Sequence, residues 1–178
     1  MDVAVKSIKR GGRGVVHLED VYSAPGHLMR RAQQIAAAIF FDETREFDLT
    51  PVQYAALVAI QDRPGIDQST LVKLIAIDRS TVGNMLRRIE GKHLISRVTP
   101  KHNQRIKQLF IAPEGQRLLR ESQAAMRRVH ERILAPLAPR DRSSLMAILA
   151  KLVHLNNEES RAPLQFVMRE EPPRRGRR

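Results

Sequence analysis

The fold is decided by residues 67–111, which read DQSTLVKLIAIDRSTVGNMLRRIEGKHLISRVTPKHNQRIKQLFI. In the first half of this stretch, apolar side chains recur twice at helical spacing. Each run follows an aspartate, Asp67 or Asp78, that can cap a helix N-terminus. We therefore predict two short helices, ending near Ile75 and Ile89 and joined by a tight turn.

The apolar period changes in the second half. Residues 94–99 and 106–111 predict two strands, and the polar, basic residues 100–105 between them predict the loop of a β-hairpin. A helix-turn-helix followed directly by a two-stranded wing is typical of nucleic-acid readers. The second helix fits the major groove, while the wing reaches the neighbouring backbone or minor groove.

The second helix has an outward face suited to DNA. Its apolar residues are expected to face inward: Val82, Met85, Leu86 and Ile89. Six polar or basic residues then face outward: Arg79, Ser80, Thr81, Asn84, Arg87 and Arg88. These residue types bond base edges and phosphates, and no acidic residue lies between them. The alternative interpretation is a solvated helix face without a ligand.

The predicted DNA contacts have different roles. We expect Asn84 and Arg87 to face base edges and Arg105 to meet the minor groove or its phosphates. Lys101 and Lys107 are expected to contact phosphate. Ser69, at the start of the first helix of the pair, completes the predicted set.

Start signals for four more helices surround this unit. Thr50 offers a hydroxyl cap, with Pro51 at the first helical position and Gln53 placed for a reciprocal bond. Further helices are expected to begin at Pro25, Pro113 and Pro139. The fold class is therefore mainly α with a small β-hairpin wing (α+β): a winged helix-turn-helix plus a helical dimerisation region.

Composition points to a polyanionic partner. The chain has 178 residues and a net charge of +12, with 31 Lys and Arg against 19 Asp and Glu. Residues 66–111 hold nine basic and three acidic residues, so a quarter of the chain supplies half of the excess. A basic surface releases counterions when it meets phosphates, which favours nucleic-acid binding.

Other classes of protein lack support in the sequence. There is no cysteine, and the apolar runs at 35–41 and 54–60 fall far short of the ~20 residues that span a bilayer, so we expect a cytoplasmic protein. Phosphate-binding loops and nucleophile elbows are missing, so neither enzymatic activity nor a cofactor is expected. No two of the six histidines stand three or four apart on one helix, which disfavours a metal site.

Four motifs together make residues 25–155 resemble the MarR family of transcriptional regulators. They are Leu49–Tyr54, Asp67–Leu71, Asp78–Val82 with Leu86, and Arg105 with the strand that follows it into Pro113–Gly115. The resemblance implies an obligate homodimer, whose first and last two helices form the dimer body, with the recognition helix and wing of each subunit on double-stranded DNA. It also implies a small-molecule effector, often an aromatic or phenolic acid, that releases the DNA.

The sequence departs from the family pattern at two places. Asn103 stands where the wing usually carries an aspartate that pairs with its arginine, and Ala112 stands where the family often has a threonine cap. The absence of cysteine removes the branch of the family that senses peroxide by thiol oxidation.

The expected organisation has three parts. A flexible basic extension covers residues 1–24, the winged-helix domain covers 25–155, and a flexible arginine-rich tail covers 156–178. Within the domain, the dimer helices are expected at 25–46 and 113–155 and the DNA-reading region at 50–111. The apolar faces that predict a homodimer lie around Val129, Ile133, Leu145, Leu149 and Leu152.

An effector site is predicted on the first helix. Its polar members are His27, Arg30, Arg31 and Gln34, with Phe40, Phe41 and Tyr54 as an apolar wall. Guanidinium groups beside an apolar wall suit an aromatic carboxylate or its coenzyme A thioester. Alternatively, Arg30 and Arg31 pair with acidic residues of a partner subunit, and His27 makes a satisfied bond at the helix start.

Two further questions stay open at this point. The rival function is an architectural winged-helix protein that binds nucleic acid broadly through charge and has no effector. The basic ends, with Arg10 and Arg13 before the fold and Arg174–Arg178 after it, are either DNA-binding arms or solvated tails.

Overall fold

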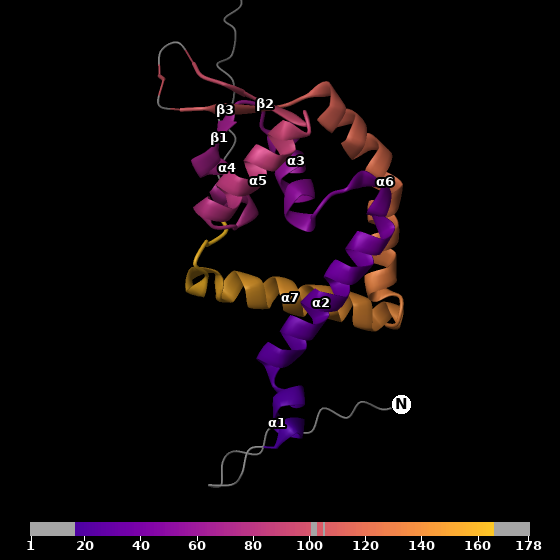
Figure 1. The fold of residues 1–178 in the computed structure, drawn as a ribbon. Coiled ribbons are helices and arrows are strands. Elements are labelled where there is room, and N and C mark those ends of the chain that lie inside the picture. The colour runs from indigo at the N-terminus through magenta and orange to yellow at the C-terminus, as the bar shows by residue number, and fades with distance from the viewer. Residues whose placement is uncertain (1–16, 101–102, 105, 166–178) are drawn as a thin grey trace, which may run out of the picture.

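The computed structural model describes residues 17–100, 103–104 and 106–165 (Figure 1). Its helices and 3₁₀ turns are α1 (Leu18–Ser23), α2 (Pro25–Glu43), η1 (Arg45–Phe47), α3 (Pro51–Asp62), α4 (Gln68–Ile75), α5 (Arg79–Gly91), α6 (Pro113–Leu134), α7 (Pro139–Leu155) and η2 (Asn157–Glu159). Its strands are β1 (Ile66–Asp67), β2 (Ile95–Val98) and β3 (Gln108–Ile111). The mainly helical fold class with a small antiparallel sheet is confirmed.

Three helix starts are capped as the sequence predicts. Thr50 Oγ1 accepts a hydrogen bond from the Gln53 amide at 3.2 Å, and Gln53 Oε1 accepts one from the Thr50 amide at 3.0 Å. Asp67 Oδ1 accepts from the Thr70 amide at 2.7 Å, and Asp78 Oδ1 does the same for Thr81 at 2.9 Å. These bonds satisfy amides that a helix leaves without intrahelical partners.

The wing is the antiparallel pair of β2 and β3, in which Ile95 lies opposite Ile111 and Val98 opposite Gln108. The structure adds β1, which pairs with β3 through Ile66 opposite Leu109. Two residues are too few to show an alternating pattern, so the sequence did not indicate this strand. Gly65 precedes it with a φ of 86°, and its amide donates to the Leu109 carbonyl at 2.8 Å.

The head, residues 49–111, has its own core. The side chains of Val82, Met85, Leu86 and Ile89 are buried, which confirms the inward face predicted for α5. They pack with buried residues of α3, α4 and β3, among them Leu57, Ile60, Leu71 and Leu109. Burial of such aliphatic side chains stabilises the head and leaves the opposite face of α5 in water.

Helix α6 approaches the head closely at Gly115. A Cβ atom at this position would lie 2.2 Å from the Leu94 carbonyl oxygen, so only glycine fits. Ala112, which precedes the helix, has no side chain that could cap it. Its own amide donates to that same Leu94 carbonyl at 3.0 Å.

The helical body pairs α2 with α6. Phe40, Met126 and Val129 form a second buried cluster between them. The expectation that Val129 faces a partner subunit is therefore wrong for this residue, because Phe40 of the same chain covers it. Arg132 Nη1 lies 2.6 Å from both Asp42 Oδ2 and Glu43 Oε1, and these ion pairs flank the cluster.

Regular structure extends into both ends that the sequence predicted to be flexible. Residues 18–23 form α1, whose N-terminus is held because the His17 amide donates to Asp20 Oδ2 at 3.0 Å. At the other end, residues 156–165 follow α7, form η2 and then lead to the C-terminal end of α4 (Figure 1). The first feature rests on a local hydrogen bond and the second on a bond from Gln165 to the distant Lys73, and composition shows neither. Residues 1–16 and 166–178 lie outside the described part.

Candidate nucleic-acid interface

The outward face of α5 is polar and open to solvent. All six residues predicted for this face are exposed: Arg79, Ser80, Thr81, Asn84, Arg87 and Arg88. Ser69 is also exposed, at the start of α4. The structure therefore leaves this predicted set available to a ligand.

The two residues predicted to face base edges are joined. Arg87 Nη2 donates a hydrogen bond to Asn84 Oδ1, one helical turn away. The bond limits the positions of a long, flexible side chain before any ligand arrives. An arginine fork held in this way is suited to bidentate contact with a guanine.

Asp78 fixes both the start of α5 and the hydroxyl of Ser80. Ser80 Oγ donates to Asp78 Oδ1 at 2.6 Å, and this bond, with those from Thr81, lowers the pKa of Asp78 far below its ordinary range. Because the Ser80 proton is used here, its oxygen presents only lone pairs to a ligand. Ser80 is therefore better suited to accept from a base amino group than to donate to phosphate.

The turn between α4 and α5 has close backbone contacts. Gln68 Nε2 donates to the Arg79 carbonyl at 3.3 Å, and a Cβ atom on Gly83 would lie 3.3 Å from that same nitrogen. Ala76, in the turn, adopts a left-handed φ of 52°. These contacts fix the angle between the two helices. The sequence analysis did not single out Gln68.

An ion pair ties the wing to α5. Arg97 Nε on β2 lies 2.8 Å from Glu90 Oε2 on α5, and the Arg97 side chain is only 17% exposed. The pair is not a well-aligned hydrogen bond, because neither Nε nor Nη2 of Arg97 has a hydrogen-bond partner among the described residues. The sequence analysis missed this pair because its partners lie on two different elements.

The wing tip is described only in part. Lys107 is exposed, as a phosphate contact requires, whereas Lys101 and Arg105 lie outside the described residues. Asn103, where the family usually has aspartate, takes part in a backbone turn: its amide donates to the Pro100 carbonyl at 3.1 Å.

The residues predicted for an effector fall into two parts. Gln34 Oε1 accepts from Arg30 and from Arg31 at 3.0 Å each, and Arg30 Nη2 lies 3.4 Å from His27 Nδ1. These side chains form one polar cluster along α2. Phe41 lies ~21 Å further along the helix than His27 at ~1.5 Å per residue.

The aromatic residues of that prediction contact one another but differ in burial: the rings of Phe40 and Phe41 meet edge to face, with centroids 5.9 Å apart. Phe41 is half exposed, whereas Phe40 is buried against α6. Tyr54 packs against both the head core and the α2–α6 cluster. Within one chain, the polar cluster and these aromatic side chains therefore do not surround a single small pocket.

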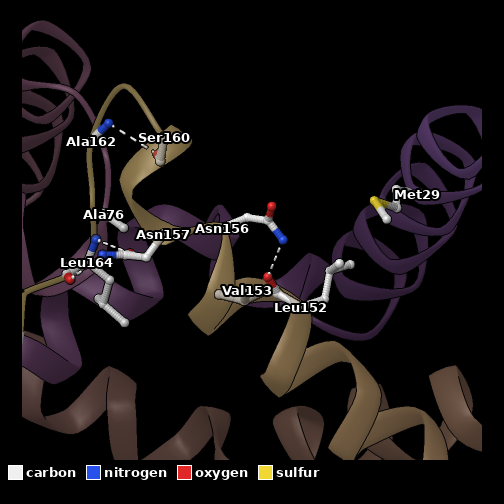
Figure 2. A pocket seen from close by; sticks show the side chains of 9 residues that line it. All are labelled: Met29, Ala76, Leu152, Val153, Asn156, Asn157, Ser160, Ala162 and Leu164. Atoms are coloured by element: carbon white, nitrogen blue, oxygen red, sulfur yellow. Dashed lines mark hydrogen bonds between the residues drawn. The ribbon is translucent and has the colours of Figure 1, made fainter.

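The structure reveals a cavity of about 530 Å³ between α7, the segment after it and the end of α4 (Figure 2). Its lining is largely apolar: Met29, Ala76, Leu152, Val153, Asn156, Asn157, Ser160, Ala162 and Leu164. The cavity could not be predicted from the sequence, because five of these nine residues belong to the tail that was expected to be flexible.

The described residues show neither a metal site nor a membrane span. They contain no group of three or more histidine, cysteine, aspartate or glutamate side chains placed to hold a metal ion. None of their helices is both long and apolar enough to cross a bilayer.

A helix-turn-helix with an exposed polar second helix, followed by an antiparallel wing, defines a winged-helix DNA-binding protein. The MarR family model matches residues 49–107, from the start of α3 into the wing. A probable transcriptional regulator from Pseudomonas aeruginosa has a structure that is 31% identical, with a TM-score of 0.70 over 76% of this chain and 99% of that one. This chain belongs to the MarR family of transcriptional regulators.

Two further relatives have informative names. The transcriptional repressor NicR of Pseudomonas putida is 27% identical over 75% of this chain and 85% of its own. The Bordetella bronchiseptica regulator BpsR, whose DNA binding is regulated by 6-hydroxynicotinic acid, is 27% identical, with a TM-score of 0.70 over 78% of this chain and 97% of that one.

Proposed function

We propose that this protein is a homodimeric, sequence-specific repressor in the cytoplasm that binds an inverted-repeat operator and is released by a small acidic effector. The observation that carries the proposal is the face of α5, where six polar or basic side chains are exposed beside the wing. In this proposal the surface recognises DNA and performs no chemistry on it.

Binding to the DNA upstream of its own gene tests the proposal, because regulators often lie beside the genes they control. Fluorescence anisotropy at physiological salt should show at least ~10³-fold tighter binding to one upstream duplex than to a scrambled duplex of the same composition. An architectural protein would bind both duplexes alike, with a steep dependence on salt. That result would contradict the proposal.

The homodimer is supported by the exposed apolar side chains of α7. They are Met146, Ile148, Leu149, Val153 and Leu155, with exposures from 40% to 69%. Exposed apolar side chains concentrated on one helix in this way mark a protein interface. Two-fold symmetry then predicts half-sites about one helical turn apart, ~10 base pairs.

Light scattering at micromolar concentration should give the mass of a dimer. Ile148→Asp places a charge in the proposed interface and should shift the protein towards a monomer. Lys151→Asp, an exposed position on the same helix, is the matched control for a new acidic group. A wild-type protein that is monomeric under these conditions would contradict the dimer.

The effector is supported by the cluster of His27, Arg30, Arg31 and Gln34 on α2, where two guanidinium groups lie side by side. Guanidinium forks recognise carboxylates. BpsR responds to an aromatic acid, 6-hydroxynicotinic acid, which supports the same class of ligand here. In this proposal the apolar wall comes from the second subunit, because the aromatic residues of the same chain do not surround the cluster.

Calorimetry with 6-hydroxynicotinate, benzoate and benzoyl-coenzyme A should detect binding to the wild type and weaker binding to Arg31→Ala and His27→Ala. The ligand that binds should also release DNA from the wild type more readily than from the variants. If a bound acid releases DNA equally from all three proteins, the cluster pairs with acidic residues of the partner instead.

A further inference from the structure

Helix α7 is weakly anchored within its own chain. None of its residues, all of which are described, is buried. At its N-terminal end, Arg142 Nε donates to the Leu137 carbonyl at 2.8 Å and holds the loop from α6. At its C-terminal end, residues 156–165 connect it to the C-terminal end of α4 (Figure 1). We name this segment the strap. The strap is therefore a link between α7 and the head.

Asn157 holds the strap in a closed loop. The Leu164 amide donates to Asn157 Oδ1 at 2.8 Å, and Asn157 Nδ2 donates to the Leu164 carbonyl at 3.2 Å (Figure 2). One side chain thus pairs both backbone groups of a residue seven positions further on. Nδ2 also donates to Glu158 Oε1 at 2.9 Å, so both donor hydrogens of this amide are used.

The far end of the strap is bonded to the helix-turn-helix. The Gln165 amide donates to the Lys73 carbonyl at 3.0 Å. Lys73 lies in the last turn of α4, where carbonyl groups have no intrahelical partner. The next few residues form the turn into α5 through the left-handed Ala76. A movement of the strap is therefore transmitted to the turn that orients the recognition helix.

Hydrogen bonds hold the strap more than packing does. Beneath it lies the cavity of about 530 Å³, lined on one side by Ala162 and Leu164 and on the other by Leu152 and Val153 (Figure 2). The cavity is open to solvent, so the apolar side chains on its two sides do not pack against one another across it. The two bonds from Asn157 to Leu164 fix the shape of the strap, and so the position of the neighbouring Gln165, whose amide bonds to Lys73.

We propose that Asn157 is a positioning residue that fixes the head relative to α7 and thereby sets the half-site spacing that the dimer accepts. The inference rests on the proposed function, in which α7 lies at the dimer interface and each α5 enters one major groove. One added base pair moves a half-site by ~3.4 Å and rotates it by ~35° around the DNA axis. A dimer with firmly held heads rejects such a change, whereas one with loosened heads tolerates it.

The test compares full-length proteins on a panel of duplexes that carry the operator half-sites at the natural spacing, one base pair closer and one base pair further apart. The wild type should bind the altered spacings at least roughly tenfold more weakly. Asn157→Ala should reduce this penalty to roughly threefold or less, because it removes both hydrogen bonds between the Asn157 side chain and Leu164. Asn157→Asp keeps the acceptor for the Leu164 amide and should give an intermediate penalty.

Two controls separate positioning from a loss of folding. Asn156→Ala removes an asparagine whose Nδ2 donates to the Leu152 carbonyl within the helix end, and it should keep the wild-type spacing profile. Leu164→Pro removes the same strap bond from the other side, by deleting the amide that donates to Asn157, and should broaden the profile as Asn157→Ala does.

The possible outcomes are distinct. A broadened profile in Asn157→Ala and Leu164→Pro, but not in Asn156→Ala, supports the inference. An unchanged profile in Asn157→Ala, or an equal loss of affinity at every spacing, overturns it. A wild-type protein without any spacing preference contradicts the proposed function itself, and the inference with it.

Discussion

The Nε atom of Arg97 on β2 lies 2.8 Å from the Oε2 atom of Glu90 on α5, and this ion pair joins the wing to the recognition helix. The two elements are the parts of the head expected to touch DNA, so their relative position determines whether they reach a groove and its neighbouring backbone together. The guanidinium is largely buried, whereas Glu90 is 41% exposed. Removing the glutamate and removing the arginine should therefore change the free energy of unfolding by different amounts.

Glu90→Gln should lower the free energy of unfolding by about 1–2 kcal/mol, because it leaves the buried charge of Arg97 without its counterion. Arg97→Met removes that charge and keeps much of the side chain's volume, so it should cost less. Urea unfolding shows which of the two variants has the lower free energy of unfolding. Equal costs, or a larger cost for Arg97→Met, would contradict the expectation that the unpaired charge of Arg97 is the main penalty.

Arg87→Ala should weaken binding to the operator by about 1–3 kcal/mol and relax the choice of sequence, because a base-reading contact is lost. Lys107→Ala should weaken all sequences alike and reduce the salt dependence by about one counterion. Anisotropy titrations on operator and scrambled duplexes at several salt concentrations measure both effects. Full selectivity in Arg87→Ala would rule out this residue as a base reader.

Asn84→Ala tests whether the bond to Arg87 matters. Because Asn84 Oδ1 accepts from the Arg87 guanidinium, the two side chains act as one unit. The double variant Asn84→Ala/Arg87→Ala should therefore lose less affinity than the two single losses added together. Simple additivity in this double-mutant cycle would show that the two side chains bind independently.

Asp78 makes stability depend on pH in the acid range. Its pKa is lowered in the folded protein, first by the hydrogen bond from Ser80 and then by those from Thr81. The charged form therefore stabilises the fold above the ordinary carboxyl pKa of about 3.9, and this contribution is lost as the pH falls through the lower folded value.

The comparison with Asp78→Asn isolates this contribution, since asparagine still caps a helix but carries no charge. The wild type should melt at a higher temperature than Asp78→Asn at pH 7. The difference should shrink below about pH 4. A difference that stays constant between pH 7 and pH 3 would contradict the assigned role of the carboxylate.

Gly115→Ala should destabilise the protein by about 1–3 kcal/mol or more, because its methyl group would meet the Leu94 carbonyl oxygen at 2.2 Å. Gly91→Ala is the matched control, since a Cβ there meets no described atom within 4 Å. It should be neutral or stabilise α5 by about 0.5–1 kcal/mol. Similar costs for the two variants would remove the argument for a close approach of α6.

Local chemistry explains which parts of the fold could be predicted from the sequence. Thr50, Asp67 and Asp78 cap their own helices, and a cap bonds a residue only three positions away. Such a signal is complete within a few residues. The inward face of α5 was predictable for the same reason, because its four apolar residues repeat at helical spacing.

The missed features depend on residues far apart in the chain or on a few isolated bonds. The Glu90–Arg97 pair joins a helix to a strand. Gln165 bonds to Lys73, which lies much earlier in the chain. His27 and Phe41 of the predicted effector site lie about 21 Å apart along α2, and their spacing in the sequence already implied this separation once both were placed on one helix. In our proposal the apolar wall of the effector site comes from a second subunit, and the residue pattern of one helix does not show which residues of a partner will face it.

The most direct test of the account is selection from a random-sequence DNA library with the wild-type protein and Arg87→Ala in parallel. The account predicts that the wild type enriches an inverted repeat with half-sites about 10 base pairs apart. It also predicts that Arg87→Ala loses the preference at one position in each half-site. If the wild type enriches no common sequence, or if Arg87→Ala selects the same repeat with the same stringency, α5 is not the sequence-reading element and the central claim is wrong.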